Sequence, residues 1–263
     1  MNRVTNQDSL PADLMKIITL LSAFLVFILS AFTYTDNKKQ QAENYFQQGE
    51  EEKALELYKD IVDEHSEDIE VVWITAMLYT RVGDRLTDSD KQQTYFDRAI
   101  TLSERALEMD DTHPEAHFTY AVTLGRMTDN ASTKDALAKA KKIRDHSKRT
   151  LELDENHGGA MHVLGLWHKR MANLSFTERA IVNTLFGGVP EGASNEKAEE
   201  YLNKAVEFSD DMILYNLDLA RFLADNGDQL KAKQLLEDLL AMDNQFKDDP
   251  GLKKEAKDLL SQL

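Results

Sequence analysis

The chain has 263 residues, of which 42% are hydrophobic, with 11 Gly, 4 Pro and no Cys. This composition supplies a folded core, holds too few turn residues for an all-β sandwich, and excludes disulfides, thiolate metal ligands and cysteine nucleophiles. The formal net charge of −16 has the wrong sign for a protein that tracks nucleic-acid phosphates, so we expect no nucleic-acid partner.

The N-terminal part of the chain is expected to target a membrane. Residues 17–35 are 19 residues without a charged side chain, and a helix of that length rises about 28 Å, close to the thickness of the hydrocarbon layer. Residues 1–35 are therefore predicted to form a membrane anchor or a cleaved signal peptide, with a buried core helix as a third reading. We expect a protein anchored by a single N-terminal span, or exported (periplasmic or extracytoplasmic) if the segment is cleaved.

The residues after position 35 contain a long-period repeat. A small residue recurs at intervals of 34, 45, 44 and 55 residues, at Ala42, Ala76, Ala121, Gly165 and Ala220. A second position is held by Ala54, Ala99, Ile143, Ala198 and Ala232. This pattern resembles the tetratricopeptide repeat (TPR), whose unit is two antiparallel helices. The resemblance implies an all-α fold: an α-solenoid of about five TPR-like hairpins over residues 36–248, preceded by the apolar N-terminal helix and capped by a helix within residues 249–263.

Three of the units are enlarged, exceeding the 34-residue period by 11, 10 and 21 residues. Eleven residues make about three helical turns, so a helix extended by that amount keeps its apolar face in phase. We expect two long helices, one capped by Ser89 and the other by Ser132 or Thr133. The third excess is expected to contain a short additional helix from Ser175 to Phe186. Ser175 and Glu178 are expected to form the capping box at its start.

The fourth unit carries a more specific signature. It consists of Gly165-Leu166-Trp167-His168, then Asn173-Leu174-Ser175-Phe176-Thr177-Glu178-Arg179, then Leu185-Phe186-Gly187-Gly188-Val189-Pro190. Together with the enlarged neighbouring repeats, this run resembles the regulator of microtubule dynamics family. The resemblance implies a helical-repeat binding protein without catalytic residues, which in several animal members is membrane-associated and linked to microtubules.

In a TPR array the first helix of each unit faces a concave groove, and cations gather on that predicted surface: Arg81, Arg126, Lys169, Arg170 and Arg221. Guanidinium groups bind carboxylates through paired hydrogen bonds, so these residues indicate a protein or peptide partner of acidic character. Beside them we expect an apolar floor that suits an amphipathic helix or an extended peptide, formed by Trp73, Met77, Phe118 and His162.

Structural explanations compete with this groove hypothesis. Cations at the C-terminal end of a helix gain about 0.3–1 kcal/mol from the helix dipole, and they can also pair with the abundant Asp and Glu residues. The apolar side chains can equally serve as ordinary packing between helices. The sequence alone does not separate these readings.

No motif in the sequence indicates catalysis. The His residues lack the HExxH spacing, and the glycine-rich run lacks the Lys-Ser/Thr pair of a phosphate loop, so we expect no catalytic residue, metal or cofactor. The predicted function is a non-enzymatic scaffold that binds a peptide or helix. Two alternatives remain open: a microtubule-associated adaptor at a membrane, if the source is eukaryotic, and a ligand-binding receptor or enzyme that uses residues 173–195 as a lid.

Overall fold

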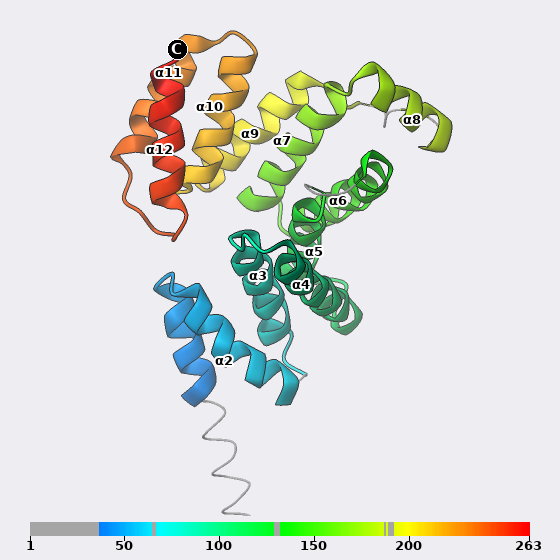
Figure 1. Ribbon diagram of the computed structural model, residues 1–263, viewed down its shortest axis with the longest axis vertical. Helices are drawn as coiled ribbons and strands as arrows, with labels where there is room; N and C mark the ends of the chain where they lie inside the picture. Colours follow the sequence, from blue (N-terminus) through cyan, green and yellow to red (C-terminus); the bar gives the residue numbers. More distant parts are fainter. Residues whose placement is uncertain (1–36, 65–66, 129–131, 187, 189–191) are drawn as a thin grey trace, which may run out of the picture.

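The described part of the chain is a succession of helical hairpins (Figure 1). The computed structural model describes residues 37–64, 67–128, 132–186, 188 and 192–263, and every regular element within these ranges is a helix. Residues 37–47 are helical. The helices that follow are α2 (Glu51–Glu64), α3 (Ile69–Asp84), α4 (Ser89–Met109), α5 (Pro114–Arg126), α6 (Thr133–Leu153), α7 (Gly158–Ala172), α8 (Phe176–Phe186), α9 (Asn195–Phe208), α10 (Ile213–Asp225), α11 (Gln229–Ala241) and α12 (Asp249–Leu260).

These helices form five two-helix units. Residues 37–47 pack with α2, and the later pairs are α3 with α4, α5 with α6, α7 with α9, and α10 with α11. Helix α8 is inserted within the fourth unit, and α12 packs against α10 and α11. The all-helical, TPR-like architecture expected from the repeat is therefore confirmed for the described residues.

Small residues stand where neighbouring helices approach most closely. In the first helix of the units, Ala42, Ala76, Ala121 and Ala220 have no exposed surface. At the corresponding place in α7, a Cβ added to Gly165 would lie 2.7 Å from Cγ of Leu202 on α9. Any larger residue at this position would therefore force Leu202 or its helix to shift. The repeated small position therefore sets the spacing of the array.

The enlarged second and third units contain long second helices, although the extension is shorter than expected. Helices α4 and α6 have 21 residues each, whereas α2 and α9 have 14. In all four helices ten residues follow the repeated position, which is held by Ala54, Ala99, Ile143 and Ala198, so the seven added residues all precede it. Seven residues are nearly two turns, which rotates the apolar face by only about 20°. The extension is therefore two turns rather than the predicted three.

Side-chain caps determine where these helices begin. Ser132 caps α6 as expected. At the start of α8, Ser175 N donates to Oε2 of Glu178 (2.9 Å) and Glu178 N donates to Oγ of Ser175 (3.3 Å), which confirms the predicted capping box. Helix α4 differs, because its cap is Asp88 rather than Ser89. An Asp side chain caps as well as Ser does, and here it lies one residue earlier.

The predicted membrane location is wrong for the part of the chain that can be tested. Within the described ranges no helix is both long enough and apolar enough to cross a membrane, which contradicts the expectation of an anchored or exported protein. These helices instead place charged residues opposite their apolar faces, as packing in an array requires. The predicted anchor or signal peptide, residues 1–35, lies outside the described residues, as does its apolar segment, residues 17–35.

The five units curve around a central hollow, so that the end of the array returns to its beginning (Figure 1). Helices α3, α5, α7 and α10 contribute residues to the wall of the hollow. Residues 243–248, the loop between α11 and α12, reach the first two units, where Arg85 pairs with Asp248 at 3.1 Å. The curvature thus brings together residues from every unit of the array.

Candidate functional site

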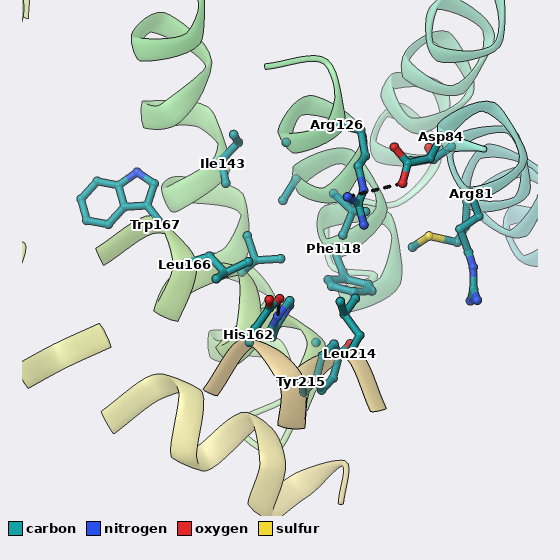
Figure 2. Close-up of a pocket in the computed structure, with 18 of the residues that line it drawn as sticks. Arg81, Asp84, Phe118, Arg126, Ile143, His162, Leu166, Trp167, Leu214 and Tyr215 are labelled. Carbon is teal, nitrogen blue, oxygen red and sulfur yellow. Dashed lines mark hydrogen bonds and ion pairs between the residues drawn. The ribbon is translucent and has the colours of Figure 1, made fainter. Parts of the chain in front are cut away.

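The central hollow is the candidate site. Its volume is about 740 Å³, within the usual range of ligand pockets. Figure 2 shows side chains from four different helices that converge on it, among them Arg81 of α3, Phe118 of α5, His162 of α7 and Tyr215 of α10. Its apolar wall consists chiefly of Trp73, Met77, Phe118, Val122, Val163, Leu166, Leu214, Phe246 and Leu252.

The structure gathers most of the residues that the sequence pointed to. Eight of the nine line the hollow: Trp73, Met77, Arg81, Phe118, Arg126, His162, Arg170 and Arg221. Lys169 is not among the lining residues, and its Nζ instead pairs with Asp225 of α10 at 2.8 Å. Whether these residues bind a partner stays a prediction, but they share one concave surface.

The predicted cationic edge is neutralised by carboxylates of the protein itself. Arg126 pairs with Asp84 of the preceding unit at 3.4 Å (Figure 2), and Arg170 pairs with Glu178 of α8. Arg221 pairs with Asp218 at 2.8 Å and also with Glu255 of α12. In a chain of net charge −16, acidic residues are available to most cations. The hollow therefore has an apolar wall, and the ion pairs of Arg126, Arg170 and Arg221 lie at its edge, which we call the rim.

Arg81 is held by the most buried carboxylate in this rim. Its Nε lies 2.7 Å from Oε1 of Glu51, and the other oxygen of Glu51 lies 2.6 Å from Nη1 of Arg85. Glu51 is 1% exposed, so both guanidinium groups are fixed against a carboxylate that water does not reach. This pairing positions Arg81, which lines the hollow, and holds Arg85 on the same carboxylate.

His162 belongs to a polar cluster in the apolar wall. Its Nε2 lies 2.8 Å from Oδ2 of Asp218, and its ring stacks on Tyr215 with the centroids 4.3 Å apart. Burial acts to raise the pKa of Asp218, but the bonds from His162 and Arg221 outweigh it and bring that pKa below its usual value. Burial also raises the pKa of Tyr215 to about 12, so its hydroxyl stays protonated. The cluster thus places a protonated phenol and an imidazole bonded to Asp218 in the wall of the hollow.

Several residues that line the hollow were not predicted from the sequence, because α10 presents a different set of positions to it. By analogy with Trp73, Phe118 and His162, the fifth residue of α10 should face the hollow, yet that residue, Leu217, is fully buried. Leu214, Tyr215 and Asp218 line the hollow in its place. Phe246 comes from a loop outside the repeat, which no periodicity could have indicated.

Two features of the described residues bear on the alternatives. No group of three or more His, Asp or Glu residues within them is placed to hold a metal ion. The wall also contains none of the described residues between 173 and 195, so the described part of the insert does not line the hollow as the lid hypothesis required. Helix α8 instead packs at the outer side of the array (Figure 1), where Val182 is buried in an apolar cluster with residues of α6 and α7.

A family model described as regulator of microtubule dynamics protein 1-3 matches residues 39–263. The chain belongs to this family. Regulator of microtubule dynamics protein 1 of Bos taurus is 27% identical over 179 residues, which cover 68% of this chain and 56% of that protein. Protein 2 of Homo sapiens is 23% identical over 214 residues, which cover 80% of this chain and 51% of that protein. This chain therefore spans just over half the length of these members of the regulator of microtubule dynamics family.

Solved structures agree on the fold of this family member. A thermophilic TPR protein of Thermus thermophilus superposes with a TM-score of 0.63 at 14% identity, covering 86% of this chain and 99% of that one. PilF of Pseudomonas aeruginosa superposes with a TM-score of 0.51 at 14% identity, covering 87% of both chains. At such identities the likeness concerns the fold alone, which is a helical-repeat array.

Proposed function

We propose that the protein is a non-enzymatic scaffold that binds a peptide or helix of a partner protein in the central hollow. The observation that carries this proposal is the shared placement of partly exposed apolar side chains from successive first helices on one concave wall. Such a wall is held rigid by the stacked units, so a peptide can dock without ordering the receptor. The fold and the family both support an interaction scaffold.

The ion pairs of the rim refine the partner that we propose. Because Arg126, Arg170 and Arg221 already hold carboxylates, an acidic peptide would have to displace them. The apolar wall is available without such an exchange. We therefore expect the partner to anchor through apolar side chains, with acidic groups contributing mainly at the rim.

The proposal is tested by peptide selection against the full chain. A displayed library of random dodecapeptides serves as the probe, and the selected peptides are measured by fluorescence polarisation. Val122→Arg places a charge in the apolar wall and should weaken binding at least about tenfold, equivalent to about 1.4 kcal/mol. Leu230→Arg is the matched control, since Leu230 is 82% exposed on α11 and lies outside the hollow. Equal binding to both variants, or no selected peptide at all, would contradict the proposal.

Association with microtubules is a second candidate function, which the name of the family suggests. Helix α6 provides a surface suited to the acidic tails of tubulin, because it carries seven Lys or Arg against three acidic residues in a chain of net charge −16. Lys134, Lys141 and Lys148 recur every seven residues along it and are exposed, and none of the three has an ion-pair partner among the described residues. This surface, rather than the paired Arg residues of the hollow, is the better candidate for such a contact.

Co-sedimentation with microtubules tests the second candidate. The full chain should pellet with microtubules in a salt-sensitive manner, and reversing Lys134, Lys141 and Lys148 to Glu should abolish the effect. Reversing Lys231, Lys233 and Lys254 of α11 and α12 changes the net charge equally and should leave most of the binding intact. Loss of pelleting in both triple variants would indicate a response to net charge alone.

A further inference from the structure

The two ends of the repeat array meet through a small set of contacts. Lys247 Nζ lies 2.5 Å from Oε1 of Glu52, and Nη1 of Arg85 lies 3.1 Å from Oδ2 of Asp248. The guanidinium of Arg81 lies over the ring of Phe246, 4.5 Å from its centroid. These pairs join the first two units to the loop 243–248, across as many as 195 residues of sequence. We call Glu52, Arg81, Arg85, Phe246, Lys247 and Asp248 the clasp.

Both sides of the clasp are locally preformed. Asp249 is 3% exposed and accepts hydrogen bonds from the backbone N–H groups of Gln245 (2.7 Å) and Phe246 (2.8 Å), which fixes the loop. On the other side, buried Glu51 holds the guanidinium groups of both clasp arginines. Gly49 has φ +70°, and a Cβ there would lie 3.1 Å from the carbonyl oxygen of Gln245. The turn of the first hairpin thus leaves room for the loop.

The clasp differs in kind from the contacts between successive units. Neighbouring units share buried apolar clusters, whereas none of these clusters in the described residues includes side chains from both the first hairpin and residues 243–263. The clasp consists of ion pairs and one cation–π contact. Its carboxylates Glu52 and Asp248 are nearly half exposed, so salt screens them and each pair is weak. The clasp can therefore open without unfolding the units that it joins.

We propose that the clasp is a releasable closure that controls entry to the central hollow. With the clasp closed, the array is a ring, and a peptide can enter the hollow only by threading one of the peptide's own ends through it. With the clasp open, the array is a groove that accepts an internal segment from the side. This inference rests on the proposed peptide-binding function for what enters, but the opening itself is a property of the chain alone.

Opening is measured as a distance, with no ligand present. Nitroxide labels are placed at Glu56→Cys and Lys254→Cys, two exposed positions on either side of the clasp, in a chain that has no other Cys. Pulsed electron resonance should give a narrow distance distribution at low salt. The distribution should broaden toward longer distances in 1 M NaCl and in the double reversal Lys247→Glu/Asp248→Lys. The control Lys231→Glu/Asp238→Lys makes the same two reversals at exposed positions of α11, where neither side chain bonds to another helix, and should keep the narrow distribution.

Access to the hollow is measured separately by the rate at which a polymer-linked maleimide modifies Val122→Cys. Opening the clasp should raise this rate about tenfold relative to the control reversal. If the label-to-label distances stay unchanged both in 1 M NaCl and in the double reversal, the clasp does not open as proposed. If the distances lengthen but the modification rate does not rise, the clasp does not control access to the hollow. Neither measurement uses a peptide, so a failed peptide selection would count against the proposed function and leave the clasp to be decided by these results.

Discussion

At the scale of single residues, Gly165 shows how one position sets the spacing of the array. Its backbone lies so close to α9 that an added Cβ would come within 2.7 Å of a side-chain carbon and 3.1 Å of the backbone nitrogen of Leu202. The backbone contact matters most, because backbone cannot turn aside as a flexible side chain can. The fourth unit therefore depends on glycine where the other units use alanine.

Gly165→Ala should lower the free energy of unfolding by about 1–3 kcal/mol, the usual cost of overpacking. Gly125→Ala is the matched control, because an added Cβ there meets nothing within 4 Å. In the control, the better helix propensity of Ala should leave stability unchanged or raise it by up to about 1 kcal/mol. Urea unfolding followed by circular dichroism measures both, and equal effects in the two variants would show that Gly165 does not set the spacing.

His168 makes stability depend on pH. It is 5% exposed, lies against Trp167 and Tyr201, and its Nδ1 has no hydrogen-bond partner in the described structure. Burial, with a smaller contribution from Lys197, lowers its pKa to about 4, while an unfolded His titrates near 6.5. As the pH falls, the unfolded chain therefore binds the proton first. The contribution of His168 is complete above pH 6.5 and is lost between pH 6.5 and 4.

Lowering the pH from 7.5 to 5 should thus reduce the free energy of unfolding of the native protein by up to about 2 kcal/mol through His168. The variant His168→Phe retains the aromatic contacts without the titrating group. Over the same pH range, the free energy of unfolding of this variant should fall by up to about 2 kcal/mol less than that of the native protein. Urea unfolding at the two pH values provides the comparison. Parallel losses in both proteins would assign the pH dependence elsewhere, for instance to His146, whose pKa is also lowered by burial to about 4.

At the scale of elements, the sequence allowed the helices to be predicted better than the surface that they present. Caps and periodic small residues are local signals, so the long helices near Ser89 and Ser132 and the insert helix beginning near Ser175 could be placed within about a residue. The partners of the Arg residues could not be found in this way. Arg126 meets Asp84 from another unit, and such pairs follow from how units stack rather than from any one helix.

Helix α8 is an element whose order depends on its cap. Hydrogen bonds from Arg170 and from Ser175 lower the pKa of Glu178 to about 2, so its carboxylate stays charged across the neutral range. Ser175→Ala removes the hydroxyl from the box and should destabilise the start of α8 by about 1 kcal/mol. Amide exchange of residues 176–186 should become faster by about fivefold, with little change in the melting temperature. Thr177→Ala, at the exposed neighbouring position, should leave that exchange unchanged, and an equal effect there would exclude a capping role.

At the scale of the whole molecule, closure changes how an array behaves. In an open solenoid each unit touches only its neighbours, so the ends fray independently of one another. Here the loop 243–248 contacts the first hairpin, which couples the two ends. The repeat pattern predicted the array, but it could not predict the closure, because curvature is the sum of small rotations between units and the contacting loop lies outside the repeat.

End coupling predicts a long-range effect on local stability. Lys247→Glu/Asp248→Lys alters the C-terminal loop, and amide exchange should accelerate in α2, the helix that carries Glu52. The reversal Lys231→Glu/Asp238→Lys is again the control and should leave exchange in α2 as it is in the unmodified protein. Exchange that accelerates only near the substituted loop would show that the ends unfold independently.

The seven residues added to the start of α6 have a consequence for the shape of the central space. Ala136, Leu137 and Ala140 line the wall along this side, which the addition lengthens by about 10 Å. Since two turns nearly restore the helical phase, every contact beyond the addition stays in register. Gain or loss of a heptad is therefore a way for arrays of this kind to change the depth of the cavity without rebuilding the scaffold around it.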